Sequence, residues 1–155
     1  MRLNPFCMML SAQARFVHGI NGKSVDFTRI IAETGIADRR IDALLDTAAV
    51  GIQRTPLFGD DYVACTLCAW PPLERVPGPS SHGTVLVHKV LSGSLAAAEG
   101  WFGFGEVGRG GAVPVRADGE VRSGESHAVS LEFEIGCARG TAAPQPMAAV
   151  NAYQW

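Results

Sequence analysis

The chain has 155 residues, of which 47% are hydrophobic and 18% charged, and its formal net charge is −2. This balance is typical of a single folded domain and excludes an intrinsically disordered chain. A charge this small, with no block of one sign, argues against nucleic acid or an anionic membrane as the main partner. No apolar run approaches the roughly 18 residues of a membrane span.

The first nineteen residues contain a short apolar run interrupted by Pro5. No basic segment precedes a long apolar stretch, so the pattern does not match a secretory signal. We therefore expect this segment to belong to the mature fold.

Two helices are predicted next, over residues 24–35 and 38–51. Ser24 or Asp26 can cap the first and Asp38 the second, and each pattern ends on a glycine. Both apolar faces are narrow, which is typical of helices that lie on a larger body.

From about residue 52, short apolar runs alternate with clusters of Gly, Pro and Ser. Short strands with regular turn signals indicate a β-sandwich or a small barrel. The pair Asp118-Gly119 predicts a hairpin turn. We therefore expect one domain over residues 1–155, with a helical part over about 1–51 and a β-barrel over about 52–155. The apolar runs are 62–70, 84–91, 95–107, 112–117, 126–136 and 147–155.

The four cysteines are Cys7, Cys65, Cys68 and Cys137. Cys65 and Cys68 have CxxC spacing, but they lie within a predicted strand, where residues three apart face opposite sides. Without a second such pair, the sequence favours buried free thiols over a zinc or thioredoxin-like site. Free thiols indicate a reducing compartment, so a cytoplasmic location is expected.

An ordered set of features covers roughly residues 52–95. It consists of Arg54, Trp70 at the end of a predicted strand, Pro72, Pro77 and the run Lys89, Val90, Leu91, Gly93, Leu95. In this order the segment resembles the first half of the cysteine-dioxygenase-type cupins. The resemblance implies a mainly β cupin-type barrel, a double-stranded β-helix, behind N-terminal α-helices. It also implies iron (Fe) as cofactor, and a small thiol or amino acid as substrate, with Arg54 binding its carboxylate. The alternative for Arg54 is a surface arginine beside a turn.

The metal-binding His-x-His of that family is not preserved, because its two positions fall on Pro79 and Ser81 in the same register. A rearranged ligand set drawn from His82, His88 and His127 is the remaining option. His82 and His88 would share a strand face, but six strand residues span about 20 Å, too far for one ion. We therefore favour His82 with His127, helped by Glu125 or Glu132. The same two histidines, His82 and His127, are the candidate catalytic residues. The alternative for each histidine is a hydrogen-bonded core or rim residue.

Trp101 and Phe104 lie in a glycine-rich strand pattern. Facing inward, they would line a substrate pocket with flat apolar walls. The alternative is plain core packing, which the pattern favours over a pocket.

Three functions follow from these features. The first is an iron-dependent oxygenase of a small thiol or amino acid with a rearranged ligand set. The second is a metal-independent cupin enzyme, an isomerase, cyclase or dehydratase, that uses acid–base catalysis. The third is a non-catalytic module that binds a small carboxylate. A protein partner is a further option for the third. We favour a small-molecule enzyme, with or without a metal, so a small-molecule substrate is the expected partner. A homodimer is expected by analogy with other cupins alone.

Overall fold

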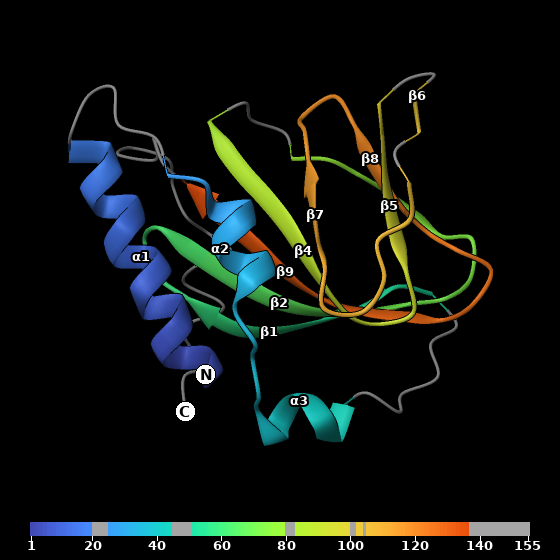
Figure 1. Cartoon of the computed structure of the whole chain (residues 1–155), viewed down its shortest axis with the longest axis horizontal. Coiled ribbons are helices and arrows are strands. Elements are labelled where there is room, and N and C mark those ends of the chain that lie inside the picture. Colours follow the sequence, from blue (N-terminus) through green and yellow to red (C-terminus); the bar gives the residue numbers. More distant parts are fainter. Residues whose placement is uncertain (20–24, 45–50, 80–82, 100–101, 104, 137–155) are drawn as a thin grey trace.

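The computed structural model describes residues 1–155 apart from 20–24, 45–50, 80–82, 100–101, 104 and 137–155. In this part of the chain, helices at the N-terminus precede a body of two β-sheets (Figure 1). The helices are α1 (Leu3–Gly19), α2 (Phe27–Glu33) and α3 (Arg39–Leu44). The strands are β1 (Gln53–Gly59), β2 (Val63–Trp70), β3 (Arg75–Pro77), β4 (Thr84–Ser92), β5 (Leu95–Glu99), β6 (Phe102–Gly103), β7 (Ala112–Val115), β8 (Glu120–Ser123) and β9 (Ala128–Gly136).

The larger sheet has the strand order β1-β2-β9-β4-β7, and the smaller sheet has the order β3-β8-β5-β6. Neighbouring strands are antiparallel throughout. Helices α1 and α2 pack on the larger sheet. Its other face is turned toward the smaller sheet, so the larger sheet is the middle layer of the molecule (Figure 1).

Strand β2 contributes to both cores, because successive side chains of a strand point to opposite faces. Cys65 lies in the core beneath the helices, with Phe6 and Phe133. Cys68 lies in the core between the sheets, with Trp70. The prediction that the two thiols face opposite sides is confirmed, and Cys7, Cys65 and Cys68 are free and buried.

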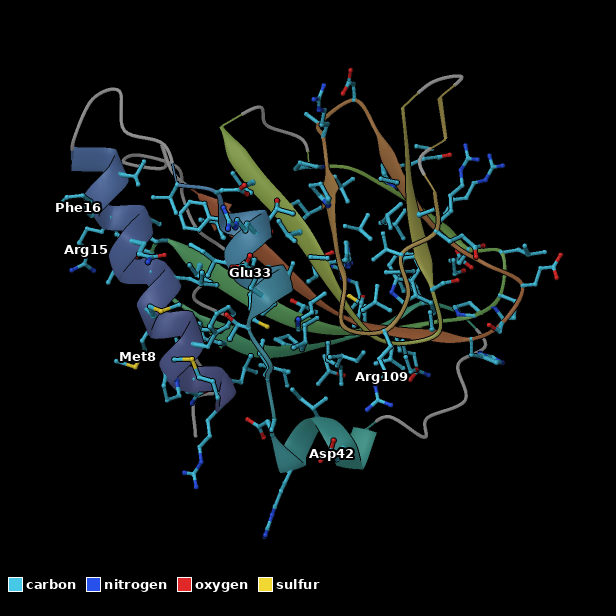
Figure 2. The ribbon with its side chains drawn as sticks, viewed as in Figure 1. Met8, Arg15, Phe16, Glu33, Asp42 and Arg109 are labelled. Carbon is cyan, nitrogen blue, oxygen red and sulfur yellow. The ribbon has the colours of Figure 1, made fainter. Side chains whose placement is uncertain are left out.

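The sequence interpretation assigned no helix to the first nineteen residues, whereas α1 is the longest helix of the described chain. Its buried residues repeat at helical spacing. Pro5 is tolerated because it lies in the first turn, where its missing N–H has no helical partner to lose. The opposite face carries Met8 and Phe16, which are 63% and 55% exposed and point away from the sheets (Figure 2). The buried face consists of Leu3, Phe6, Cys7, Leu10 and Ala14.

Helix α2 is shorter than the predicted range 24–35. Asp26 caps α2 by accepting a hydrogen bond from the Arg29 N–H at 3.0 Å. The helix ends at Glu33, two residues before the end of the predicted range, because Thr34 is already extended, at φ −96° and ψ 119°. The predicted extension of α3 over residues 45–50 lies outside the described residues.

Lys89 holds α2 against the larger sheet. Its side chain faces the helices and is 4% exposed. Its Nζ donates hydrogen bonds to the carbonyl oxygens of Ile31 at 2.9 Å, Ala32 at 3.4 Å and Gly110 at 3.1 Å. These carbonyls include groups in the last turn of α2, which have no partner within the helix.

The Asp118-Gly119 prediction was right about the turn and wrong about the hairpin. The Gly119 N–H bonds the Arg116 carbonyl at 3.0 Å, which closes a turn. However, β7 pairs with β4 in the larger sheet, and β8 pairs with β3 and β5 in the smaller one. The turn therefore carries the chain from one sheet to the other. No helix among the described residues is long and apolar enough to cross a membrane.

Candidate functional site

A set of polar side chains gathers on the face of the larger sheet that is turned toward the smaller one. In the register of the sheet, Arg54 of β1 is opposite Cys68 of β2, and Cys68 is opposite Ser130 of β9. Glu132 of β9 is opposite His88 of β4. Opposite residues point to the same side, and Ser130 and Glu132 are two apart, so all five share one face.

Glu132 is the centre of this set. Its Oε1 accepts a hydrogen bond from Nη2 of Arg54 in an ion pair. Its Oε2 lies 3.4 Å from Nε2 of His88. The side chain of Glu132 is 7% exposed and that of Arg54 is 42% exposed, so Arg54 connects the buried carboxylate to solvent.

Ser130 fixes the orientation of His88. Its Oγ accepts a hydrogen bond from Nε1 of Trp70 at 2.9 Å and lies 3.1 Å from Nδ1 of His88. The Trp70 and His88 rings also meet edge to face, with centroids 5.5 Å apart. Both Ser130 and His88 are fully buried. The imidazole is therefore held on one side by a hydrogen-bonded network, while its other nitrogen faces Glu132.

Burial sets the protonation of these groups. Burial, with the charge of Arg54 as the second cause, lowers the pKa of His88 to about 3, so the imidazole is neutral at neutral pH. Burial raises the pKa of the Cys68 thiol to about 12, with the Glu132 charge as the second cause. Burial also raises the pKa of Glu132, and Arg54 opposes this shift.

Nε2 of His88 is buried and has no hydrogen-bond partner among the residues that the structure describes. A buried polar atom left unpaired costs about 1–3 kcal/mol, so nearly all such atoms in folded proteins have partners. The atom faces two further potential ligands, since donor atoms of Cys68, His88 and Glu132 lie within 4.8 Å of one another. Imidazole, thiolate and carboxylate together are a suitable donor set for a divalent transition-metal ion. The residues present therefore fit a metal.

A cavity of about 310 Å³ lies between β7 of the larger sheet and β5 and β8 of the smaller one, and none of the five residues of the cluster is part of its wall. This volume is at the lower end of small-molecule pockets, about 300–1,000 Å³. Val113, which forms part of its wall, is opposite His88 in the register of β4 and β7. The lining is mostly apolar, with Arg116 and Glu120 as its charged residues.

The structure brings together three of the residues named from the sequence, Arg54, His88 and Glu132. His127 immediately precedes β9 and is exposed, outside the cluster. His82, Trp101 and Phe104 lie outside the described residues. The predictions for these four residues therefore stay predictions.

Sequence reasoning missed Cys68 as a potential ligand and Ser130 and Trp70 as its neighbours, and it named Glu132 only as a helper to His82 and His127. One signal was present. Glu132 is a carboxylate inside the apolar run 128–136, where a charged residue needs a partner.

No known protein-family profile matches the chain, and no curated protein matches it in sequence. Solved structures do resemble it. A protein with a double-stranded β-helix domain from Klebsiella pneumoniae superposes with a TM-score of 0.53 at 10% identity, over 70% of this chain and 95% of the other. A cupin superfamily protein from Desulfitobacterium hafniense gives a TM-score of 0.50 at 16% identity, over 60% and 84%.

This chain has the cupin fold. The expected mainly β cupin architecture with N-terminal helices is thus confirmed, although no hydrogen-bonded ladder among the described strands joins the two sheets into a closed barrel. A third match, a protein from Thermus thermophilus, has a TM-score of 0.52 at 19% identity, over 66% of this chain and 98% of the other. These structural similarities support the cupin fold alone. They do not show that the chain belongs to the narrower cysteine-dioxygenase type.

Proposed function

We propose that this cupin is a small-molecule enzyme whose reaction centre is the buried cluster of His88, Glu132 and Cys68. The observation that carries the proposal is the unpartnered Nε2 of His88, which is fully buried and lies 3.4 Å from a carboxylate oxygen. Buried groups with perturbed pKa values and an unsatisfied polar atom are typical of functional sites rather than of packing.

Arg54 is the proposed substrate-binding residue. One side of its guanidinium holds Glu132, and the 42% exposure of the side chain leaves donors directed to solvent. A guanidinium binds a carboxylate through two parallel hydrogen bonds and keeps its charge when partly buried. A small substrate with a carboxylate could therefore be anchored at Arg54, with its reacting end directed at the cluster.

Two kinds of chemistry are compatible with this arrangement. In a metal-independent enzyme, His88 and Glu132 would exchange protons with the substrate. In an oxygenase of a small thiol or amino acid, the cluster would hold iron, which supplies the one-electron chemistry that oxygen activation needs. The second is favoured because His88 and Glu132 approach within 3.4 Å without forming a hydrogen bond, as two ligands of one ion would. A binding module without catalysis is the remaining candidate, and it requires Arg54 alone.

The test is a turnover screen with small carboxylates, with and without a thiol group. Oxygen consumption and NMR detection of products are followed for iron-supplied and for chelator-treated protein. We expect His88→Gln to lower kcat by at least about 100-fold, because the group acts at the reacting atoms. We expect Arg54→Gln to raise KM by at least about 10-fold, because it removes the charged partner of the substrate carboxylate.

Arg122→Gln is the matched control, because Arg122 also pairs with a glutamate, Glu120, but on the smaller sheet. This variant should keep both kinetic constants. Saturable binding of the carboxylates without turnover would show that the chain is a binding module and not an enzyme. Turnover that survives His88→Gln would place the reaction centre elsewhere.

A further inference from the structure

The geometry points to a site for a divalent transition-metal ion whose ligands are Sγ of Cys68, Nε2 of His88 and the carboxylate of Glu132. This ligand set is not the histidine set that the sequence resemblance implies. Its role in catalysis rests on the proposed function, but metal binding itself is measured independently of turnover.

The donors come from three adjacent strands of one sheet. Cys68 lies on β2, Glu132 on the central strand β9 and His88 on β4. Their donor atoms are within 4.8 Å of one another, and the His88–Glu132 distance is already 3.4 Å. Ligands of a tetrahedral ion with bonds of about 2.0–2.3 Å lie roughly 3.3–3.8 Å apart. The donor atoms therefore have to approach one another by up to roughly 1–1.5 Å to reach that spacing.

The surrounding hydrogen bonds orient two of the donors for an ion. Ser130 engages Nδ1 of His88, which leaves Nε2 as the nitrogen that can coordinate. Arg54 holds Oε1 of Glu132, which leaves Oε2 directed at His88. Ligand histidines and carboxylates in metalloproteins are held by such outer hydrogen bonds.

Metal binding also changes the charge of the site. Binding replaces the S–H bond of Cys68 with a sulfur–metal bond and releases that proton to solvent. The thiolate and the carboxylate then offset two positive charges, the imidazole is neutral, and the Arg54 guanidinium paired with Glu132 leaves a net charge of +1. Three protein ligands leave at least one position for water or substrate, as in catalytic metal sites. Sulfur, nitrogen and oxygen together suit Zn²⁺ or Fe²⁺ rather than Mg²⁺ or Ca²⁺.

Titration of the tag-free full chain with Co²⁺, after chelator treatment, tests the site directly. We expect about one cobalt per chain, with a near-ultraviolet thiolate-to-cobalt charge-transfer band. Cys68→Ser should abolish that band and weaken Zn²⁺ binding by more than about 100-fold. Removing a residue that only hydrogen-bonds to a ligand typically weakens metal binding by about 10–100-fold, so a larger loss identifies a ligand. Cys65→Ser is the matched control, since Cys65 is equally buried on the same strand but faces the other core.

The remaining ligands are tested in the same titration. Glu132→Gln should weaken Zn²⁺ binding by more than about 100-fold, whereas Glu134→Gln, two residues along the same strand, should not. His88→Gln should behave like Glu132→Gln. A site that loses its ion in His82→Gln or His127→Gln and keeps it in His88→Gln would overturn the proposal in favour of the histidine set.

Zinc-edge X-ray absorption of the wild-type chain keeps the proposal testable if the variants fail to fold. One Zn–S distance of about 2.3 Å with nitrogen or oxygen ligands at about 2.0–2.2 Å is expected. Absence of sulfur, or no bound metal, overturns the site. Turnover in chelator-treated protein, with no metal bound, would support the proposed enzyme and reject the metal site. A sulfur-ligated ion without turnover would support the metal site and reject the proposed enzyme.

Discussion

The proposed role of this site depends on the surroundings of the two ring nitrogens of His88. His88 is surrounded by apolar strands, yet each of its ring nitrogens faces a polar group contributed from far along the chain. Its Nδ1 reaches Ser130, and its Nε2 faces Glu132. A buried imidazole with one nitrogen fixed and the other unpaired is oriented for a ligand rather than merely packed.

Ser130→Ala should destabilise the metal-free protein by about 2–4 kcal/mol, because it leaves both Nε1 of Trp70 and Nδ1 of His88 buried without a partner. The measurement is the free energy of unfolding in urea. Ser126→Ala, at an exposed position, should change it by less than about 0.5 kcal/mol. Equal stability of the two variants would show that the Ser130 network is not formed.

At the scale of elements, α1 contributes a large part of the core beneath the helices. Phe6 is fully buried and meets the Phe133 ring edge to face, with centroids 5.6 Å apart. Phe6→Ala should therefore lower the free energy of unfolding by about 3–5 kcal/mol. Met8→Ala, on the exposed face of the same helix, should lower it by less than about 0.5 kcal/mol. A small effect at Phe6 would mean that α1 is not docked on the sheet.

Lys89→Met tests the attachment of α2. Methionine keeps a similar stem but loses the three hydrogen bonds to backbone carbonyls of α2 and Gly110. We expect a loss of about 2–3 kcal/mol in unfolding free energy, with faster amide exchange confined to α2 and its neighbours. Arg29→Met removes only the exposed pair with Glu33, so about 0.5 kcal/mol is expected. Exchange that stays slow in α2 of the Lys89→Met variant would contradict this role.

At the scale of the whole molecule, the two sheets depend on the tight connections between them. Gly93 lies between β4 of the larger sheet and β5 of the smaller one, with φ +71°. A Cβ there would lie 2.4 Å from the carbonyl oxygen of His127. Both the backbone angle and this contact require glycine.

Gly93→Ala should therefore cost about 2–4 kcal/mol, from the left-handed backbone together with the displaced β9 entry. Thermal unfolding followed by circular dichroism measures it. Gly105→Ala, where an added Cβ meets nothing within 4 Å, is the control and should leave the melting temperature nearly unchanged. Similar melting temperatures for both variants would contradict the tight turn.

Local pattern alone determined much of the architecture. The apolar runs over 62–70, 84–91, 112–117 and 126–136 became β2, β4, β7 and β9 with small changes at their ends. The alternation within a strand also separated Cys65 from Cys68 correctly. These features depend on a residue and its immediate neighbours along the chain, so the sequence expresses them directly.

Strand pairing and the candidate site were decided only by the tertiary structure. Nothing local indicates that β9 lies between β2 and β4, or that β7 and β8 belong to different sheets. The site depends on that pairing, since Arg54 and Glu132 are 78 residues apart and Trp70 and Ser130 are 60 apart. Spacing along the chain suggested pairs of histidines. Strand pairing instead brought one histidine close to a carboxylate and a thiol. Cross-strand neighbours are determined by strand register and not by sequence distance.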